Sequence, residues 1–477
     1  MEWLTNYTVW QWILVVGSSV LLYAISPLAR SPAAFFRGAR RERRPGTLAL
    51  MSSLVISWLF AKSITNAANL GLSFGILGGV AYAGYYLSFA VAGVVIYYMR
   101  TRGGFTSIHE FLKSRFGRGA VMTFSLLICF RLFNEVWSNT MVIGSYFGAV
   151  GSGSYYISIL VFTSLTLAYS LRGGMSSSIL TDIVQLVLFG VLLAVILGAI
   201  LPALDYRITP LLETATPANG GGNTSAGAHN LLLVALLQSL SYPFHDPVLT
   251  DRGFLASPRS TLRAFLWAVP LGAVCIVAFS LVGVYGRLLG VEGQAAVEVG
   301  KLLGGPVLLV MNFIMITSAA STLDSTFSSF SKLAIVDIKI GGPEPTPRKG
   351  RWAMVAITLL GTLPVFLDPA ILSATTVSGA MVVGLAPVFC LWWLPAPRLS
   401  FYASVGGGLV AGTAYALDAW PARWVMGGGT YADLLSVTVI SVVICFVLYL
   451  LPRYFGGTDF RRRSVKSTLP QRKATYA

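Results

Sequence analysis

Thirteen apolar stretches, each about as long as a membrane-spanning helix, follow one another along the chain. An α-helix needs about 20 mostly apolar residues to cross the hydrocarbon core of a bilayer. The stretches lie near residues 9–29, 48–74, 75–100, 119–148, 154–172, 175–203, 230–256, 262–289, 304–335, 351–367, 370–395, 400–420 and 431–452. Only 11% of the residues are charged, against about 25% in soluble domains. We therefore expect an all-α, multi-pass protein of about thirteen transmembrane helices in a cell membrane (plasma or inner membrane).

Basic residues gather in the loops that would share one face of the membrane. They follow the first, third, ninth and thirteenth stretches: Arg30, Arg37, Arg40, Arg41, Arg43, Arg44; Arg100, Arg102, Lys113, Arg115, Arg118; Lys339, Arg348, Lys349, Arg351; and Arg453, Arg461, Arg462, Arg463, Lys466, Arg472, Lys473. An excess of Lys and Arg marks the cytoplasmic face. We predict the N-terminus outside and the C-terminus inside. Since these loops account for the net charge of +16, we expect a lipid bilayer as partner and no nucleic acid.

Two of the stretches are interrupted near their midpoints. The first interruption is a run of polar residues and glycine in 48–74: Lys62, Asn66, Asn69 and Gly71. The second is Tyr242-Pro-Phe-His-Asp-Pro247 in 230–256. Unpaired backbone groups cost several kcal/mol in hydrocarbon, so such breaks persist only where they line a cavity. Paired breaks in two halves of a chain indicate the binding site of a transporter.

The two interruptions divide the chain into two five-helix units, 47–203 and 229–395. Because five is odd, the second unit begins on the opposite face, which predicts an inverted repeat. The remaining parts lie outside these units. They are an extra N-terminal helix with a basic cytoplasmic loop (1–46), an extracellular loop (204–228), two C-terminal helices (396–452) and a basic cytoplasmic tail (453–477).

The ninth stretch contains the most hydroxyl-rich segment of any span, 317–326. Residues three and four apart share a helix face, which places Ser318, Ser321, Thr322 and Ser325 together, with Asp324 just beside them. Small hard cations prefer oxygen ligands. A single Ser or Thr usually bonds its own helix, but a cluster that includes a carboxylate favours a cation site.

Several ionisable side chains fall inside the predicted spans, where such residues usually serve function. They are Lys62, Arg131, Glu135, Asp182, Asp246 and Asp324. Arg131 and Glu135 are spaced i, i+4 and can neutralise each other, which favours a structural pair. His245, within the second interruption, either lines the cavity or binds solute directly.

Four blocks of the sequence resemble the solute–sodium symporter family. Two lie in the first half: Thr106-Ser-Ile-His-Glu-Phe-Leu112 with Arg115-Phe-Gly117, and Arg172-Gly-Gly-Met175 with Thr181-Asp-Ile-Val-Gln185. Two lie in the second half: Asp251-Arg252 with Leu255-Ala256, where the family has Gln in place of Asp251, and Ser318-Ala-Ala-Ser-Thr-Leu-Asp-Ser325. The last block is the most specific. The resemblance covers about residues 47–395 and implies the leucine-transporter-type fold, with ten core helices in two inverted repeats.

The resemblance implies a sodium site between the broken first core helix and the eighth core helix. Its ligands would be the carbonyls of Ala61, Ile64 and Ser318 and the hydroxyls of Ser321 and Thr322. A possible second cation site, found in some members, would consist of Asp182, Asp324 and Ser325 beside Ser321.

Solute would bind beside the first interruption and along the helices that face it. The expected residues are Thr65, Asn66, Ala67, Ala68, Asn69, Glu135, Asn139, His245 and Asp246. Their chemistry suits a small polar solute such as an amino acid, a carboxylate or a urea-like amide.

Lys62 departs from the family pattern because it lies between two of the implied sodium ligands, where a neutral residue is the rule. An ammonium near a bound cation is repulsive unless an acid screens it. Three alternatives follow. Lys62 pairs with an acid such as Asp182 and sodium stays, or it replaces sodium, or it binds the carboxylate of an anionic solute.

These features predict a secondary active transporter that couples Na⁺ to the symport of a small polar organic solute by alternating access. One alternative is a proton-coupled or uncoupled transporter in which Lys62 replaces sodium. A more distant one is a transporter-like membrane sensor, for which the basic tail is too short to supply a signalling domain. We do not expect an enzyme, because no HExxH motif, paired His or Cys spacing or Ser–His–Asp arrangement is present. No obligate protein partner is evident.

Overall fold

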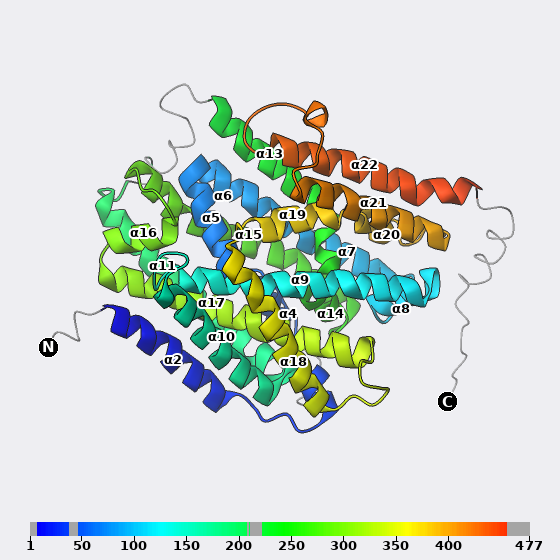
Figure 1. Ribbon diagram of the computed structural model, residues 1–477, viewed down its shortest axis with the longest axis horizontal. Helices are drawn as coiled ribbons and strands as arrows, with labels where there is room; N and C mark the ends of the chain where they lie inside the picture. The colour runs from blue at the N-terminus through cyan, green and yellow to red at the C-terminus, as the bar shows by residue number, and fades with distance from the viewer. Residues whose placement is uncertain (1–6, 38–45, 208, 210–221, 456–477) are drawn as a thin grey trace.

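The computed structural model describes residues 7–37, 46–207, 209 and 222–455, and all the regular structure in these ranges is helical (Figure 1). The extracellular loop expected at 204–228 lies partly outside this part of the chain. So does the first basic loop, at residues 38–45, and so does nearly all of the basic tail expected at 453–477. The domain boundaries predicted there remain predictions.

Nine helices in the described ranges are long and apolar enough to cross a membrane, or ten if one bent pair counts as a span. The nine are α2 (Tyr7–Ile25), α6 with η1 and α7 (Ile76–Thr101), α9 (Arg118–Gly144), α10 (Gly153–Gly173), α11 (Met175–Ala203), α15 (Pro258–Leu288), α17 with η3 (Gly305–Asp337), α18 with η4 (Pro347–Leu367) and α22 (Ala432–Phe455). The multi-pass helical class is thus supported, whereas the count of thirteen is not confirmed. Helices also occupy the other three expected spans, but they are interrupted or less apolar: α13 (Gly222–Gln238) with η2 (Tyr242–His245) and α14 (Pro247–Arg252); α19 (Ser373–Met381) with α20 (Leu385–Cys390); and α21 (Arg398–Ala416).

The first interrupted span is broken earlier than the sequence suggested. Helix α4 (Thr47–Ile56) and helix α5 (Ala61–Phe74) meet at an angle of 62°. The break is therefore at residues 57–60, and the prediction that Lys62, Asn66, Asn69 and Gly71 interrupt the helix was wrong. The polar side chains among them lie within α5 and bond partners elsewhere in the fold, which are Glu135, Tyr82 and Gln294, so they need no break in the backbone.

The second interrupted span is broken where the sequence predicted. Helix α13 ends at Gln238, η2 covers Tyr242–His245, and α14 begins at Pro247. Proline has no N–H and so cannot donate within a helix interior, and Pro243 and Pro247 each stand in the first turn of a new element. Asp246 caps α14, because its Oδ1 accepts from the N–H groups of Val248 and Leu249.

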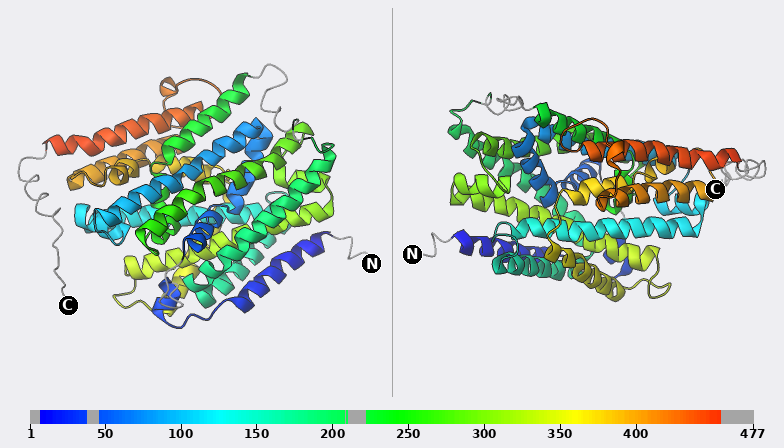
Figure 2. Two further views of the ribbon diagram at one scale, coloured as in Figure 1. Left: turned by 180° about the vertical axis from the view of Figure 1, so that it is seen from behind. Right: turned by 45° about the horizontal axis from the view of Figure 1, so that its top comes forward.

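The order of elements repeats between the two halves. In each half a broken span is followed by a long helix, a short helix and another long helix. The short helices, α8 (Ile108–Phe116) and α16 (Ala295–Leu302), lie at opposite ends of the bundle in Figure 1. This placement is the one that an inverted repeat requires. Helices α2 and α22 lie along opposite flanks of the bundle (Figure 2).

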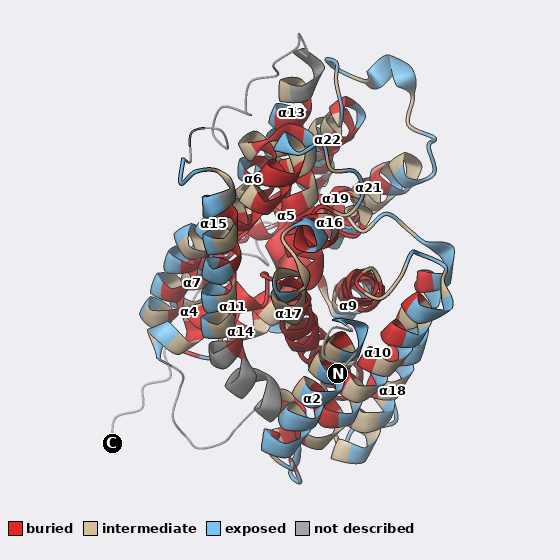
Figure 3. Ribbon diagram, turned by 90° about the vertical axis from the view of Figure 1, so that its left-hand side faces the viewer, coloured by how far each residue is buried: buried red, intermediate tan, exposed pale blue. Residues whose placement is uncertain are grey.

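Buried residues gather around α5, α9 and α17, while exposed residues face outward from the surrounding helices (Figure 3). Many outward side chains are large and apolar, such as Trp267 and Val274 on α15, each 65% exposed. At the centre, α5 packs against α15 backbone to backbone. A Cβ added at Gly283 would overlap the carbonyl of Ala68, so only glycine permits this approach.

Candidate functional site

The two helix breaks meet each other at the middle of the molecule. Trp58, in the first break, donates its indole N–H to the Oδ2 atom of Asp246, in the second break, over 2.9 Å. Both side chains are buried. The hydroxyl of Tyr86 also holds the first break by donating to the carbonyl of Trp58 over 2.9 Å. Segments 188 residues apart in sequence thus form one polar centre.

Four buried charges surround this meeting point. Glu135 Oε1 lies 2.7 Å from both Lys62 Nζ and Arg131 Nη1. Arg131 Nη2 lies 3.3 Å from Asp246 Oδ2, and its Nη1 also donates to the hydroxyl of Tyr242 over 2.5 Å. Two cations and two carboxylates balance, which is the arrangement that buried ions require.

Asn139 fixes the start of α5 to this cluster. Its Oδ1 accepts from the N–H of Lys62 over 3.1 Å, which satisfies a donor in the first turn of the helix. Its Nδ2 donates to Glu135 Oε2 over 2.9 Å. The predicted solute residues Glu135, Asn139 and Asp246 therefore do come together, and Lys62 lies among them.

The other predicted solute residues form no hydrogen bond with the four charged side chains in the described part of the chain. Asn66 donates weakly to the hydroxyl of Tyr82 over 3.4 Å, and Thr65 is buried nearby on α5. Ala67 and Ala68 are buried, with the Ala68 carbonyl packed on α15. The Nδ1 atom of His245 forms a hydrogen bond of 2.6 Å with the carbonyl oxygen of Tyr242. Its buried Nε2 atom has no hydrogen-bond partner within the described chain.

Asn69 lies away from the cluster, at the end of the bundle that carries α16. Its Nδ2 donates to Gln294 over 3.2 Å, and its Oδ1 accepts from the N–H of Ala295 over 3.0 Å. At the same end, Arg287 donates to the carbonyls of Leu72 and Ser73. These bonds hold α5 closed against the segment that leads into α16.

Lys62 pairs with Glu135 and not with Asp182, the acid named for it from the sequence. Asp182 instead forms an ion pair with Arg252, with Arg252 Nη2 and Asp182 Oδ2 2.8 Å apart. Arg252 also donates to the hydroxyl of Ser57 over 2.6 Å. The two pairs therefore form separate groups, one around Glu135 and one beside the hydroxyl-rich helix α17.

Asp182 links the first broken span to α17. Its Oδ2 accepts from Ser53 on α4 over 2.6 Å, and its Oδ1 accepts from Ser321 over 3.2 Å. Thr322 bonds the Ser318 carbonyl of its own helix over 3.0 Å. The buried hydroxyl of Ser318 has no partner in the described ranges. Two residues of the predicted second cation site, Asp324 and Ser325, are buried on α17 as well.

The carbonyl groups of the first break differ from those assigned by resemblance. Ala61 and Ile64 lie inside α5, where a carbonyl accepts from the N–H four residues on. In the break itself, the Phe60 carbonyl accepts from Ser63 and Ile64. The carbonyls of Ser57 and Leu59 accept no hydrogen bond from the described residues. They are the backbone oxygens that a cation could bind without disturbing a helix.

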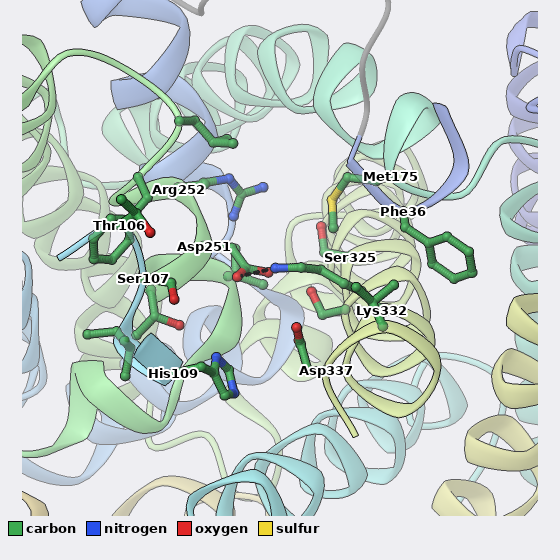
Figure 4. A pocket seen from close by; sticks show the side chains of 17 residues that line it. Phe36, Thr106, Ser107, His109, Met175, Asp251, Arg252, Ser325, Lys332 and Asp337 are labelled. Carbon is green, nitrogen blue, oxygen red and sulfur yellow. Dashed lines mark hydrogen bonds and ion pairs between the residues drawn. The ribbon is translucent and has the colours of Figure 1, made fainter. Parts of the chain in front are cut away.

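A cavity of about 430 Å³ leads toward the site from the end of the bundle where α8 begins. Figure 4 shows Arg252, Ser325 and the ion pair of Asp251 and Lys332 along its walls, with Nζ and Oδ1 2.5 Å apart. A second, much smaller cavity of about 20 Å³ touches Arg131, Glu135 and Asp246 and shares Val248 and Ser325 with the first. The charged centre is thus approached from one end, opposite the closed α16 end.

Four residues of the site were missed or undervalued from the sequence. Arg131 was counted among the ionisable residues of the spans but interpreted mainly as the structural partner of Glu135, and Arg252 was given no partner or role in the site. Tyr242 was placed in the second interruption but given no role, and Trp58 carried no signal, because an aromatic residue in an apolar stretch is ordinary. A tryptophan or tyrosine beside a helix break could have been a clue, since each needs a hydrogen-bond partner when buried.

This architecture, with two broken helices around a buried polar centre, is that of a membrane transporter, and comparisons with known proteins agree. Residues 42–237 match the model of the sodium:solute symporter family. This match confirms the resemblance for the first half of the chain, and the blocks at Asp251–Ala256 and Ser318–Ser325 lie outside the matched residues. None of the curated proteins compared with the chain matches it.

Solved structures with the same fold include a sodium-coupled symporter and a cation-symport family transporter. A Na⁺-coupled sialic acid symporter in a substrate-bound outward-open state is 16% identical, with 94% of this chain and 98% of that chain covered and a TM-score of 0.66. Mhp1, a nucleobase-cation-symport-1 family transporter, closed with bromovinylhydantoin bound, is 12% identical, with 92% and 99% covered and a TM-score of 0.54. MhsT in complex with L-phenylalanine is 14% identical, with 86% and 99% covered and a TM-score of 0.55. The leucine-transporter-type fold is confirmed, and the matched family and neighbours are transporters and not enzymes.

Proposed function

We propose that the protein is a secondary active transporter that couples inward movement of Na⁺ to the uptake of a small polar organic solute by alternating access. One observation carries this proposal: two breaks from opposite halves of the chain meet around balanced buried charges, at the end of a cavity open on one side. Broken helices at the midplane are the usual site of solute and ion in such repeats.

The proposed sodium position is between the first break and α17. Hydroxyls of Ser321 and Thr322, the Ser318 carbonyl and the unpaired carbonyls of Ser57 and Leu59 would supply the oxygen ligands. We prefer these two carbonyls to those of Ala61 and Ile64, because the latter pair lies inside a helix. Asp182, bonded to Ser321, would lend negative charge from the side.

The ion would act by holding the two halves of the site together in one state. A ligand shifts a conformational equilibrium only through its different affinity for the two states. The distance between the first break and α17 would set that difference. Moving one charge across 100 mV supplies about 2.3 kcal/mol, and a sodium gradient adds to it.

The solute would bind in the four-charge cluster on the other side of the break. Glu135, Asn139 and Asp246 would accept or donate hydrogen bonds to it, and Lys62 would present an ammonium. The bond from Lys62 to Glu135 supports a role for Lys62 in solute binding more than a role in replacing sodium.

Proton-coupled or uncoupled transport is a second candidate, favoured by the position of Arg252. Its guanidinium already bonds Asp182 and Ser57 beside the proposed ion position. A tethered cation there would take over the bridging role that sodium has in the first proposal. The two proposals differ in one measurable property, the dependence of binding on sodium.

A thermal-stability screen of the purified protein against small polar solutes, in sodium or in potassium at equal ionic strength, tests the proposal. A ligand present at 100 times its Kd stabilises the folded state by about 2.7 kcal/mol. We expect sodium, and not potassium, to raise the melting temperature and to strengthen the response to one solute class. A response to solute that is equal in both salts, with proton uptake on binding, would favour the second candidate.

The double variant Ser321→Ala, Thr322→Ala should lose the sodium response while melting normally in potassium. The matched control is Thr358→Ala, Thr362→Ala on α18, because those hydroxyls bond only carbonyls of their own helix. An unchanged sodium response in the Ser321, Thr322 variant would reject this ion position.

A further inference from the structure

A third cavity, separate from the proposed transport site, lies at the surface where α7 ends and α8 runs. Its volume is about 840 Å³. The walls come from the end of α7 (Leu87–Thr101), the turn that follows, one face of α8 and the segment after α20. The lining residues are Tyr98, Thr101, Arg102, Gly103, Gly104, Phe105, Ser114, Arg115, Trp392 and Trp393.

Two arginines line this cavity, and no acid does. Arg102 is exposed and stacks over the ring of Tyr98, 4.6 Å from its centroid. Arg115 is half-buried on α8. In the part of the chain that the structure describes, neither forms an ion pair. Both guanidinium groups therefore keep their donors for an external acceptor.

The side chain of Arg115 is partly buried where it lines the cavity. Burial lowers the pKa of its guanidinium below the ordinary value, which means that the surroundings disfavour its charge. A bound anion would offset that cost, because planar guanidinium groups bind phosphate oxygens in pairs.

The charge around the cavity is also positive. Lys113 on α8 and Arg118 at the start of α9 are exposed close by in the chain, and Arg398 lies against Gly117 at the end of α8. The one acid of α8, Glu110, bonds the N–H and hydroxyl of Thr106 over 2.8 and 2.5 Å. It does not line the cavity, and among the described residues it forms no ion pair with either arginine.

The rim of the cavity has the chemistry of a membrane interface. Trp393 is 56% exposed and Tyr98 37%, and Trp and Tyr are enriched where membrane spans meet water. The α7 segment is part of a predicted span that ends at Thr101. A molecule in the cavity would therefore have a polar end among the arginines and an apolar end along the exposed side of α7.

We propose that this cavity binds the headgroup of an anionic glycerophospholipid, with its phosphate on Arg102 and Arg115. Basic pockets between helices on the cytoplasmic side are typical positions for such headgroups. The shared chemistry is a phosphate oxyanion, and the exposed aromatic rim favours a lipid over free phosphate.

Native mass spectrometry of the protein in detergent, titrated with phosphatidylglycerol or phosphatidylcholine of the same acyl chains, tests the proposal. We expect the parent to bind phosphatidylglycerol at least tenfold more tightly than phosphatidylcholine. The double variant Arg102→Gln, Arg115→Gln should lose this preference. The matched control Arg348→Gln, at an exposed arginine on α18 outside the cavity, should keep it.

Two further arms separate the effect of charge from that of folding, and lipid from free phosphate. The charge-conserving variant Arg102→Lys, Arg115→Lys should retain part of the preference, which keeps the test valid if the Gln variant does not fold. Inorganic phosphate should not displace the lipid at millimolar concentration. Displacement by phosphate, equal binding of the two lipids, or an unchanged preference in the folded Gln variant would each overturn the lipid assignment.

Discussion

Glu135 is the residue on which the electrostatics of the site depend. One of its oxygens lies 2.7 Å from both Lys62 Nζ and Arg131 Nη1, while Asp246 balances the second of these cations. In a low-dielectric interior a charge that loses its partner is far more costly than a neutral pair. The effect of a substitution here therefore follows from the net charge that it leaves behind.

Glu135→Gln should be strongly destabilising, because Lys62 and Arg131 would then share a single acid. Lys62→Met should be destabilising too, with the opposite excess charge. Breaking a buried pair costs about 3–5 kcal/mol. The double variant restores neutrality through Arg131 and Asp246, so we expect it to recover at least half of the loss, measured by thermal unfolding in a lipid nanodisc.

The control for this cycle is the exposed ion pair of Lys301 and Glu298 on α16. The same Met and Gln substitutions there should change stability by about 0–1 kcal/mol, as is usual for surface pairs. If the double variant at Lys62 and Glu135 were no more stable than Glu135→Gln alone, the balance of charges would not be what stabilises the cluster.

At the scale of elements, the two breaks show what a sequence does and does not reveal. Pro243 and Pro247 have no backbone N–H and cannot donate a helical hydrogen bond, so the second break could be located from the sequence. The first break, Ser57-Trp-Leu-Phe60, contains neither proline nor glycine and looks like the middle of an apolar helix. The polar residues of α5 drew the prediction to the wrong place, because their partners, Glu135, Asn139 and Gln294, are distant in the chain.

Local spacing explains which parts of the site were predictable. The pair of Arg131 and Glu135 lies one helical turn apart and could be foreseen. The bonds of Lys62 to Glu135 and of Asp182 to Arg252 join residues 73 and 70 positions apart. Which residues become partners over such distances depends on how the helices pack, and the periodicity of a single sequence does not contain that information.

The close contact of α5 and α15 gives a prediction at the same scale. Gly283→Ala would drive its new methyl group into the Ala68 carbonyl of α5. Overpacking of this kind costs about 1–3 kcal/mol, so the melting temperature should fall. Gly198→Ala on α11 is the control, because nothing lies within 4 Å of the added Cβ. Equal effects of the two substitutions would mean that α5 and α15 can separate freely.

At the scale of the whole molecule, the site is open at one end and closed at the other. The cavity of about 430 Å³ begins near α8, while Asn69, Gln294 and Ala295 close the α16 end. With the predicted orientation, in which the α8 end is cytoplasmic, this is the inward-facing state of alternating access. In the proposed mechanism, the two ends would exchange roles when ion and solute bind.

Ser329→Cys tests both the state and the orientation, because Ser329 lines the open cavity and is otherwise buried. A membrane-impermeant maleimide should label it in inside-out vesicles and not in right-side-out vesicles. Sodium should slow the labelling several-fold, because an ion that favours the outward-facing state depletes the state in which the cavity is open. Arg348→Cys, exposed on α18, is the control and should react at the same rate with or without sodium.

Labelling of Ser329→Cys from the outside alone would show that the predicted orientation in the membrane is reversed. If sodium left the labelling rate unchanged, sodium binding would not drive the conformational change, because a ligand that binds two states equally well cannot shift the equilibrium between them.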